Sequence, residues 1–120
     1  MSERTNKFIL DLSYAFALKI VSYAEVLEKS RNYEEAEGLF KSGTSIGANI
    51  RDAQSAESSD GFIYYLTNAV KEAEYTRHRL LNHRNSGNYP DVQDLINDIR
   101  AMKDFINDII KTHKNEMFKV

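Results

Sequence analysis

The sequence contains no cysteine, which excludes disulfide bonds, thiolate metal sites and redox catalysis through sulfur. The fold therefore has to depend on its apolar core. A chain of 120 residues can build one, because a domain of this size buries about two thirds of the surface of its unfolded state. A protein without cysteine also suits a reducing compartment, and we expect it to be cytoplasmic.

Turn-forming residues and long apolar runs are equally scarce. One proline and five glycines are too few for an all-β protein, which needs a turn about every ten residues. No apolar run approaches the roughly 18 residues of a membrane span. The first residues, Met1–Lys7, are polar and of mixed charge, unlike a signal peptide. We therefore expect an α-helical protein outside the membrane.

Charge of one sign is also lacking. The 16 basic and 18 acidic residues leave a net charge of −2, so no overall field attracts the protein to nucleic acid. Nucleic-acid binding would have to come from a local basic patch.

What the sequence does contain is helical periodicity. Apolar residues recur at intervals of three and four, which places them on one face of a helix in each of four segments. We expect helices over about Asn6–Lys29, Glu34–Ala56, Gly61–Asn85 and Pro90–Lys114. The expected core faces are Ile9, Leu12, Phe16, Ile20, Tyr23 and Leu27; Ala36, Leu39, Phe40, Gly43, Ile46, Gly47, Ile50 and Ala53; Phe62, Leu66, Ala69, Ala73, Thr76 and Leu80; and Val92, Leu95, Ile99, Met102, Ile106 and Ile109.

The expected helix ends follow from capping residues. Asn6 and the cluster Ser58–Asp60 suit N-caps, Gly87 suits a left-handed C-cap, and Pro90 suits the first position of the last helix. The short connections make neighbouring helices antiparallel. We therefore predict an all-α protein with one domain over residues 1–120, an antiparallel up-down-up-down four-helix bundle.

The second segment contains two glycines, Gly43 and Gly47, on its inward face. Each glycine inside a helix costs about 0.5–1 kcal/mol relative to alanine. Close approach of a neighbouring helix would compensate for this cost, and the alternative is a break in the helix near Gly43. Small residues beside Asn49 favour packing, with Asn49 in a buried or interfacial hydrogen bond.

The sequence has more apolar residues than four core faces need. Tyr64 and Tyr65 are adjacent and cannot both face one core, while Phe105 and Ile110 flank the last stripe and Phe8 flanks the first. These residues either lie half-buried on the shoulders of the bundle or form a subunit interface. Both interpretations stay open at this point.

The stretch from Lys41 to Ala53, KSGTSIGANIRDA, resembles the signature of a small bacterial family, the 23S rRNA intervening-sequence proteins. The accessory protein of diversity-generating retroelements is a relative of that family. The pattern continues through Asp60–Ile63, Lys71–Glu74 and the turn Ser86–Tyr89, so that the resemblance covers most of the chain.

The resemblance implies a four-helix bundle and a homo-oligomer, a ring of five subunits. In the retroelement relative, the ring binds a reverse transcriptase and nucleic acid. That relative is strongly basic, whereas this chain is mildly acidic. The residues that we expect in helix packing or in contacts between subunits are Gly43, Ile46, Gly47, Asn49, Arg51, Tyr64, Tyr65 and Phe105.

The densest basic cluster lies near the end of the third segment. Arg77, Arg79 and Arg84 could bind nucleic acid, because arginines attract phosphates. The competing interpretation is a solvated face that stabilises the helix C-terminus and pairs with aspartates of the fourth segment. His78 and His83 are five residues apart and point to different faces, which argues against a shared metal.

No nucleophile, base and oxyanion site occur together, and no phosphate-binding loop is present. We therefore predict no enzymatic activity, no cofactor, no metal and no small-molecule substrate. The favoured function is a homo-oligomeric helical scaffold, pentameric as the resemblance implies, for a protein or RNA partner. The alternative is a nucleic-acid-binding accessory protein that acts with a reverse transcriptase or ribosomal RNA.

Overall fold

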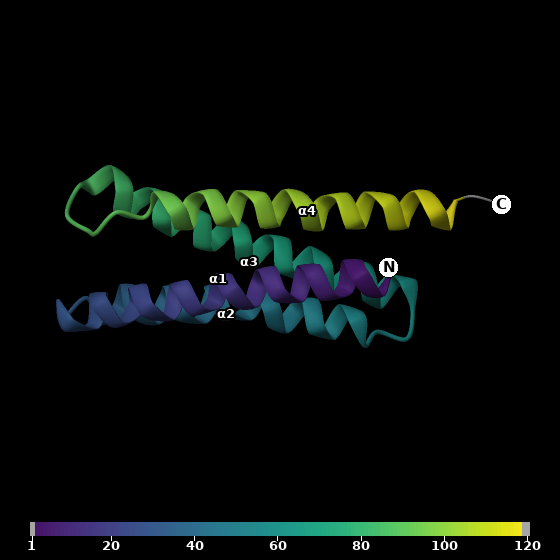
Figure 1. Ribbon diagram of the computed structural model, residues 1–120, viewed down its shortest axis with the longest axis horizontal. Coiled ribbons are helices and arrows are strands. Elements are labelled where there is room, and N and C mark those ends of the chain that lie inside the picture. The colour runs from purple at the N-terminus through teal and green to yellow at the C-terminus, as the bar shows by residue number, and fades with distance from the viewer. Residues whose placement is uncertain (1, 119–120) are drawn as a thin grey trace.

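A computed structural model describes residues 2–118 of the chain. Its helices are α1 (Glu3–Lys29), α2 (Tyr33–Gln54), α3 (Ser59–Ser86) and α4 (Gln93–Met117), and they alternate in direction (Figure 1). Each helix packs against its neighbours in sequence, and α1 also packs against α4. The molecule is the predicted antiparallel four-helix bundle, a rod with dimensions of 55 × 23 × 21 Å.

The core consists largely of the predicted faces. Ile20, Ile46, Leu66 and Ile99, one from each helix, are completely buried. Burying each such side chain stabilises the fold by roughly 1.5–3 kcal/mol. Ile96 is also completely buried, although the predicted stripe of α4 did not include it. The core face of α4 is therefore wider than the three-and-four spacing indicated.

The N-terminal cap of α1 was predicted wrongly. Ser2 is the N-cap, and its hydroxyl accepts a hydrogen bond from the Thr5 backbone N–H at 3.1 Å. Asn6 lies in the second turn of the helix, where the backbone N–H is already bonded to the Ser2 carbonyl. The cap of α3 is Ser58, as predicted, and it accepts from the Gly61 N–H at 3.0 Å.

The connection between α3 and α4 ends later than predicted. Gly87 adopts the expected left-handed conformation with φ of 71°. Pro90, however, precedes the helix, because α4 begins only at Gln93. The Asp91 carboxylate accepts from the Gln93 backbone N–H at 3.0 Å and so forms the turn that starts α4. The extra loop residues place Tyr89 against the body of the bundle.

Helix α2 runs unbroken through both glycines, so the alternative of a break near Gly43 was wrong. A Cβ atom at Gly43 would lie 2.8 Å from Cγ2 of Ile20 in α1, which is too close for any side chain. At Gly47 the nearest atom would be the Ser13 hydroxyl at 3.4 Å, an ordinary contact. Side chains of α1 therefore approach the backbone of α2 at both glycines, and Gly43 is the tighter of the two positions.

Phe40 was wrongly predicted to lie in the core, since 48% of it is exposed. The adjacent Leu39 is completely buried. Successive residues of a helix point about 100° apart, so only one of the two can face the centre of the bundle.

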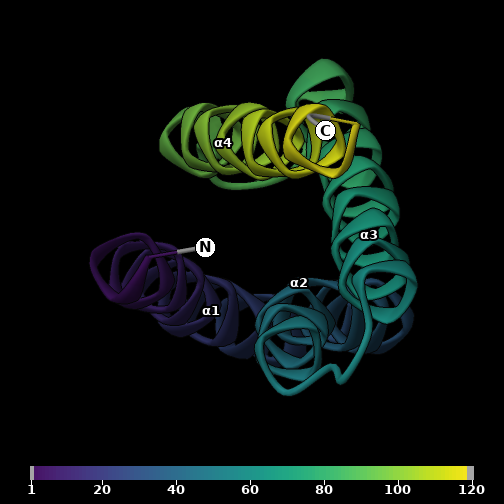
Figure 2. The ribbon, with the colours of Figure 1, turned by 90° about the vertical axis from the view of Figure 1, so that its right-hand side faces the viewer.

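The bundle is less closed at the end where both chain termini lie (Figure 1). There the start of α1 and the end of α4 diverge, as Figure 2 shows along the axis. Phe62 and Ile109, two predicted core residues at this end, are only partly buried, and Leu12 is partly buried as well. The core is therefore incompletely covered between α1 and α4.

The two glycines of α2 should respond oppositely to alanine. Gly43→Ala gains about 0.5–1 kcal/mol of helix propensity but forces Ile20 away, and overpacking costs about 1–3 kcal/mol. We expect a net loss of about 1 kcal/mol. Gly47→Ala meets only ordinary contacts and should gain about 0.5 kcal/mol. Urea unfolding of both variants measures the difference, and shifts in the same direction would contradict the close approach at Gly43.

Candidate functional site

A buried polar cluster joins the helices at the end of the bundle opposite the termini. His83 of α3 is 2% exposed, and its Nδ1 lies 2.7 Å from the hydroxyl of Tyr23 in α1. The Tyr89 ring, from the loop before α4, stacks on the imidazole with 3.9 Å between ring centres and 10° between planes. His83 thus connects α1, α3 and the α3–α4 loop.

The second half of the cluster is an ion pair between α2 and α3. Arg79 donates to the carboxylate of Glu35 and, at 2.7 Å, to the hydroxyl of Tyr75. Gly38 provides the space for this guanidinium, because a Cβ there would lie 2.5 Å from Cζ of Arg79. His83 Nε2 lies 3.7 Å from the Glu35 carboxylate, too far for a hydrogen bond.

Burial fixes the protonation of this cluster. Desolvation lowers the pKa of His83, although the nearby Glu35 acts in the opposite direction, and desolvation raises the pKa of Tyr23. The imidazole is therefore neutral at neutral pH, and its Nδ1 shares a hydrogen bond with the Tyr23 hydroxyl whose direction depends on the imidazole tautomer. With both side chains at most 7% exposed, the pair is closed to a substrate and acts as a structural connection.

His83 should make stability depend on pH. Its pKa in the unfolded chain is about 6.5, and because the folded value is lower, the unfolded state binds the proton first. Stability is therefore greatest above about pH 6.5 and should fall as the pH decreases from about 7 to about 5. Urea unfolding across this range should show the loss in the wild type and a smaller slope in His83→Asn.

The matched control is His78→Asn, since His78 is exposed. This variant should keep the pH dependence of the wild type. An unchanged slope in His83→Asn would show that the buried imidazole is not the group that titrates.

The arginines predicted to bind nucleic acid lie on two faces of α3. Arg79 points toward α2 and is paired with Glu35. Arg84 reaches α4, where it donates to Gln93 at 3.2 Å. Arg77 lies 3.9 Å from Glu74 of its own helix, and Glu74 in turn pairs with Lys103 of α4. The structure therefore brings Arg77 and Arg84 to one side and separates Arg79 from them.

Two basic residues of α4 join that side, which periodicity in α3 alone could not reveal. Lys103 pairs with Glu74 at 2.7 Å. Together with the Arg84–Gln93 contact, this pairing fixes the register of the two antiparallel helices and places Arg100 opposite Arg77. Arg77, Arg84, Arg100 and Lys103, together with the carboxylate of Glu74, form what we call the α3–α4 basic patch.

The residues predicted for packing and subunit contacts divide by exposure. Ile46, Gly43 and Gly47 are buried between helices, and the Asn49 amide donates to the Ser45 carbonyl of its own helix at 3.0 Å. Tyr64 is 60% exposed and contacts the partly buried Tyr65 edge-on. Arg51 is exposed. Phe105 packs against Phe8 with ring centres 4.9 Å apart. Contacts of the exposed residues with another subunit stay a prediction.

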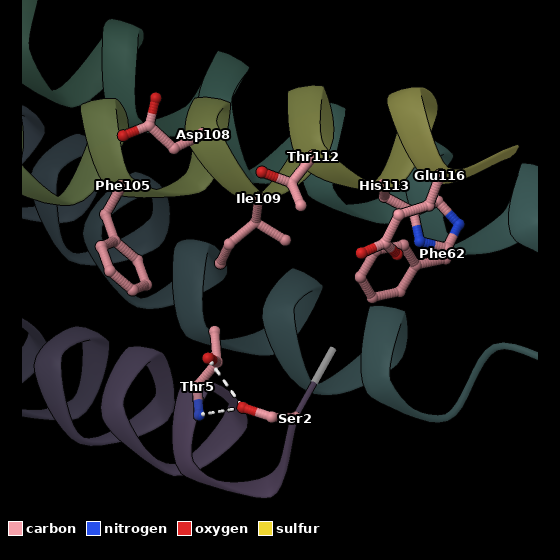
Figure 3. Close-up of a pocket in the computed structure, with 9 residues that line it drawn as sticks. All are labelled: Ser2, Thr5, Phe62, Phe105, Asp108, Ile109, Thr112, His113 and Glu116. Atoms are coloured by element: carbon pink, nitrogen blue, oxygen red, sulfur yellow. Dashed lines mark hydrogen bonds between the residues drawn. The ribbon is translucent and has the colours of Figure 1, made fainter. Parts of the chain in front are cut away.

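A pocket of about 320 Å³ opens at the end where α1 and α4 diverge (Figure 3). Phe62, Phe105 and Ile109 form its apolar surface, and the His113 ring lies against Phe62 with ring centres 4.5 Å apart. Asp108 and Glu116 line it as well. This pocket could not be predicted from the sequence, because Phe62 and Ile109 have the spacing of core residues.

No group of three or more His, Asp and Glu side chains suited to a metal ion occurs within residues 2–118. No helix in that range is long and apolar enough to cross a membrane.

Residues 6–108 match the family model of the 23S rRNA-intervening sequence proteins. The chain belongs to this family. The matched range includes the two-glycine segment of α2 and both residues of the Tyr23–His83 pair. The resemblance inferred from the motif of α2 is thereby confirmed.

A crystal structure similar to this 23S rRNA-intervening sequence protein comes from Bacteroides thetaiotaomicron. It is described as a protein of unknown function from the S23 ribosomal protein family. The two chains are 32% identical, with a TM-score of 0.83 over 89% of this chain and 98% of the other. No functionally curated protein matches the sequence.

Proposed function

We propose that this protein is a non-enzymatic scaffold that assembles into a homo-oligomer and binds a protein or RNA partner. The observation that supports assembly is an exposed apolar surface shared by α1 and α2. Five subunits is the number that the family resemblance implies.

The surface runs along the outside of the α1–α2 pair. Tyr14 and Leu18, one turn apart on α1, are 64% and 53% exposed. The contacts of Gly43 with Ile20 and of Gly47 with Ser13 set the register of the helices. Phe40, which is 48% exposed, lies three residues before Gly43 and therefore on the flank of α2 that faces α1. Val21 lies three residues after Leu18 and continues its row on α1. Tyr14, Leu18, Val21 and Phe40 form the α1–α2 apolar face, and contiguous apolar surfaces of this kind usually mark contacts between proteins.

A charge placed on the α1–α2 apolar face should dissociate the oligomer. Leu18 is exposed, so Leu18→Glu leaves the core intact, whereas burying an unpaired carboxylate in an interface is costly. We expect light scattering at micromolar concentration to give the mass of an oligomer for the wild type and a smaller mass for Leu18→Glu.

Ala101→Glu is the matched control, because Ala101 is an exposed small residue on α4 and receives the same charge away from this face. Circular dichroism should show both variants to be helical. A wild-type protein that is monomeric at micromolar concentration would refute the oligomeric scaffold.

Nucleic-acid binding is the second candidate, and the α3–α4 basic patch favours it. The four cations of the patch, of which Lys103 is paired with Glu74, are concentrated on one side of a protein of net charge −2. Such a patch can bind phosphates through a salt-dependent electrostatic interaction. The 23S rRNA in the family's name makes RNA the first nucleic acid to test. In this role the protein would act as an accessory to an RNA-processing enzyme.

Substitutions can distinguish the roles of the three arginines that were predicted to bind nucleic acid. Arg77→Ala and Arg84→Ala should each weaken retention on RNA at low ionic strength and reduce its salt dependence, by roughly 0.7 in log–log slope per lost contact with single-stranded RNA. Arg79→Ala should leave retention unchanged and lower stability instead, because Arg79 is engaged with Glu35. Absence of any salt-dependent retention of the wild type would rule out this candidate.

A further inference from the structure

The groove between α1 and α4 is an uncovered continuation of the core. Phe105, Ile109 and His113 are spaced by four residues on α4, and all three line the pocket of about 320 Å³. Phe62 of α3 lines the pocket as well and packs against the His113 ring. Figure 3 shows these side chains directed from α3 and α4 toward the start of α1, where Ser2 and Thr5 complete the lining.

The spacing of this surface suits a helix as its occupant. A row of side chains at intervals of four is the ridge that another helix receives in its grooves. The apolar surface continues past the pocket, because Phe105 contacts Phe8, which is itself 51% exposed. Recognition of an amphipathic helix by an apolar groove is a recurrent mode of protein binding.

The charges at the groove indicate which charged side chains the bound helix should carry beside its apolar face. Asp108 and Glu116 are exposed, and they are the carboxylates among the described lining residues, which include no lysine or arginine. The buried Nε2 atom of His113 lacks a hydrogen-bond partner within the described chain. A phosphate backbone would be repelled by the two carboxylates, whereas lysine or arginine side chains would be attracted. The charges thus favour a basic protein segment over nucleic acid.

We infer that this groove binds a basic amphipathic helix of a partner protein, with apolar side chains against Phe62, Phe105 and Ile109 and cations beside Asp108 and Glu116. This inference names the partner of the proposed scaffold and so rests on that function. The groove is separate from the α1–α2 apolar face and from the α3–α4 basic patch, so each can be tested without the others.

The probe is a fluorescein-labelled synthetic peptide of about 18 residues, five helical turns, with leucines on one face and lysines and alanines elsewhere. A peptide of the same composition with its leucines spread around the helix is the reference. Fluorescence anisotropy with the full-length protein should show saturable binding of the first peptide and at least about tenfold weaker binding of the second.

Variants of the protein test where the peptide binds and whether the groove carboxylates attract it. Thr112 is exposed and lines the groove, so Thr112→Trp should fill it and abolish binding. Asp108→Lys should weaken binding about tenfold. Asp104→Lys is the matched control, since Asp104 is exposed on α4 outside the lining, and it should bind as the wild type does.

Four results would overturn the inference. They are no saturable binding to the wild type, equal binding of both peptides, equal losses in Asp104→Lys and Asp108→Lys, or a decrease in the mass of the protein alone on Thr112→Trp. The last result would assign the groove to a second copy of this chain. Saturable binding to a wild-type monomer would support the groove while refuting the oligomer, so the two failures are distinguishable.

Discussion

The contact of α1 with α2 at Gly43 is the constraint on which the arrangement of the other helices depends. With Ile20 packed directly against the backbone of α2, the rotation of α2 about its own axis is fixed. A different side of α2 then presents Gly38 and Ser42 to α3. Thr76 meets Ser42 at 2.8 Å, and Arg79 occupies the space above Gly38. One close approach thus determines which face of α2 receives α1 and which receives α3.

The two ends of the rod are built differently. At one end, hydrogen bonds, ring stacking and an ion pair connect α1, α2, α3 and the loop before α4 through His83 and Arg79. At the other end, α1 and α4 meet through the ring pair of the exposed Phe8 and the partly buried Phe105. Directional hydrogen bonds, ring stacking and an ion pair together favour one arrangement, whereas an apolar contact between two rings is less directional. The proposed groove lies at the end of the termini, and the α1–α2 apolar face and the α3–α4 basic patch lie on the outside of the bundle.

Much of the fold could be predicted from the sequence, because helix type depends on local periodicity. Each completely buried side chain of the α1, α2 and α3 cores falls on a predicted face, and the caps Ser58 and Gly87 were correct. The errors at Asn6 and Pro90 are errors of one turn. In both cases a nearby side chain, Ser2 or Asp91, accepts the hydrogen bond that defines the true start.

The candidate sites were less predictable, because they depend on which helices meet. The direction of Arg79 away from Arg77 follows from helix geometry, but its pairing with Glu35 requires the position of α2. Arg100 and Lys103 belong with Arg77 only in the observed register of α3 and α4. Phe62 and Ile109 have the spacing of core residues, and only the divergence of α1 from α4 makes them the lining of a groove. No pattern within one helix contains that information.

The difference between the two ends has a consequence for local unfolding. Regions with few buried contacts open more often than the rest of a protein, so backbone amides in the first turns of α1 and the last turns of α4 should exchange with solvent sooner than those around His83. A molecule that occupies the space between these turns would slow their exchange by holding them together. A bound molecule would thereby be detected as slower amide exchange at the end of the termini, with unchanged exchange around His83.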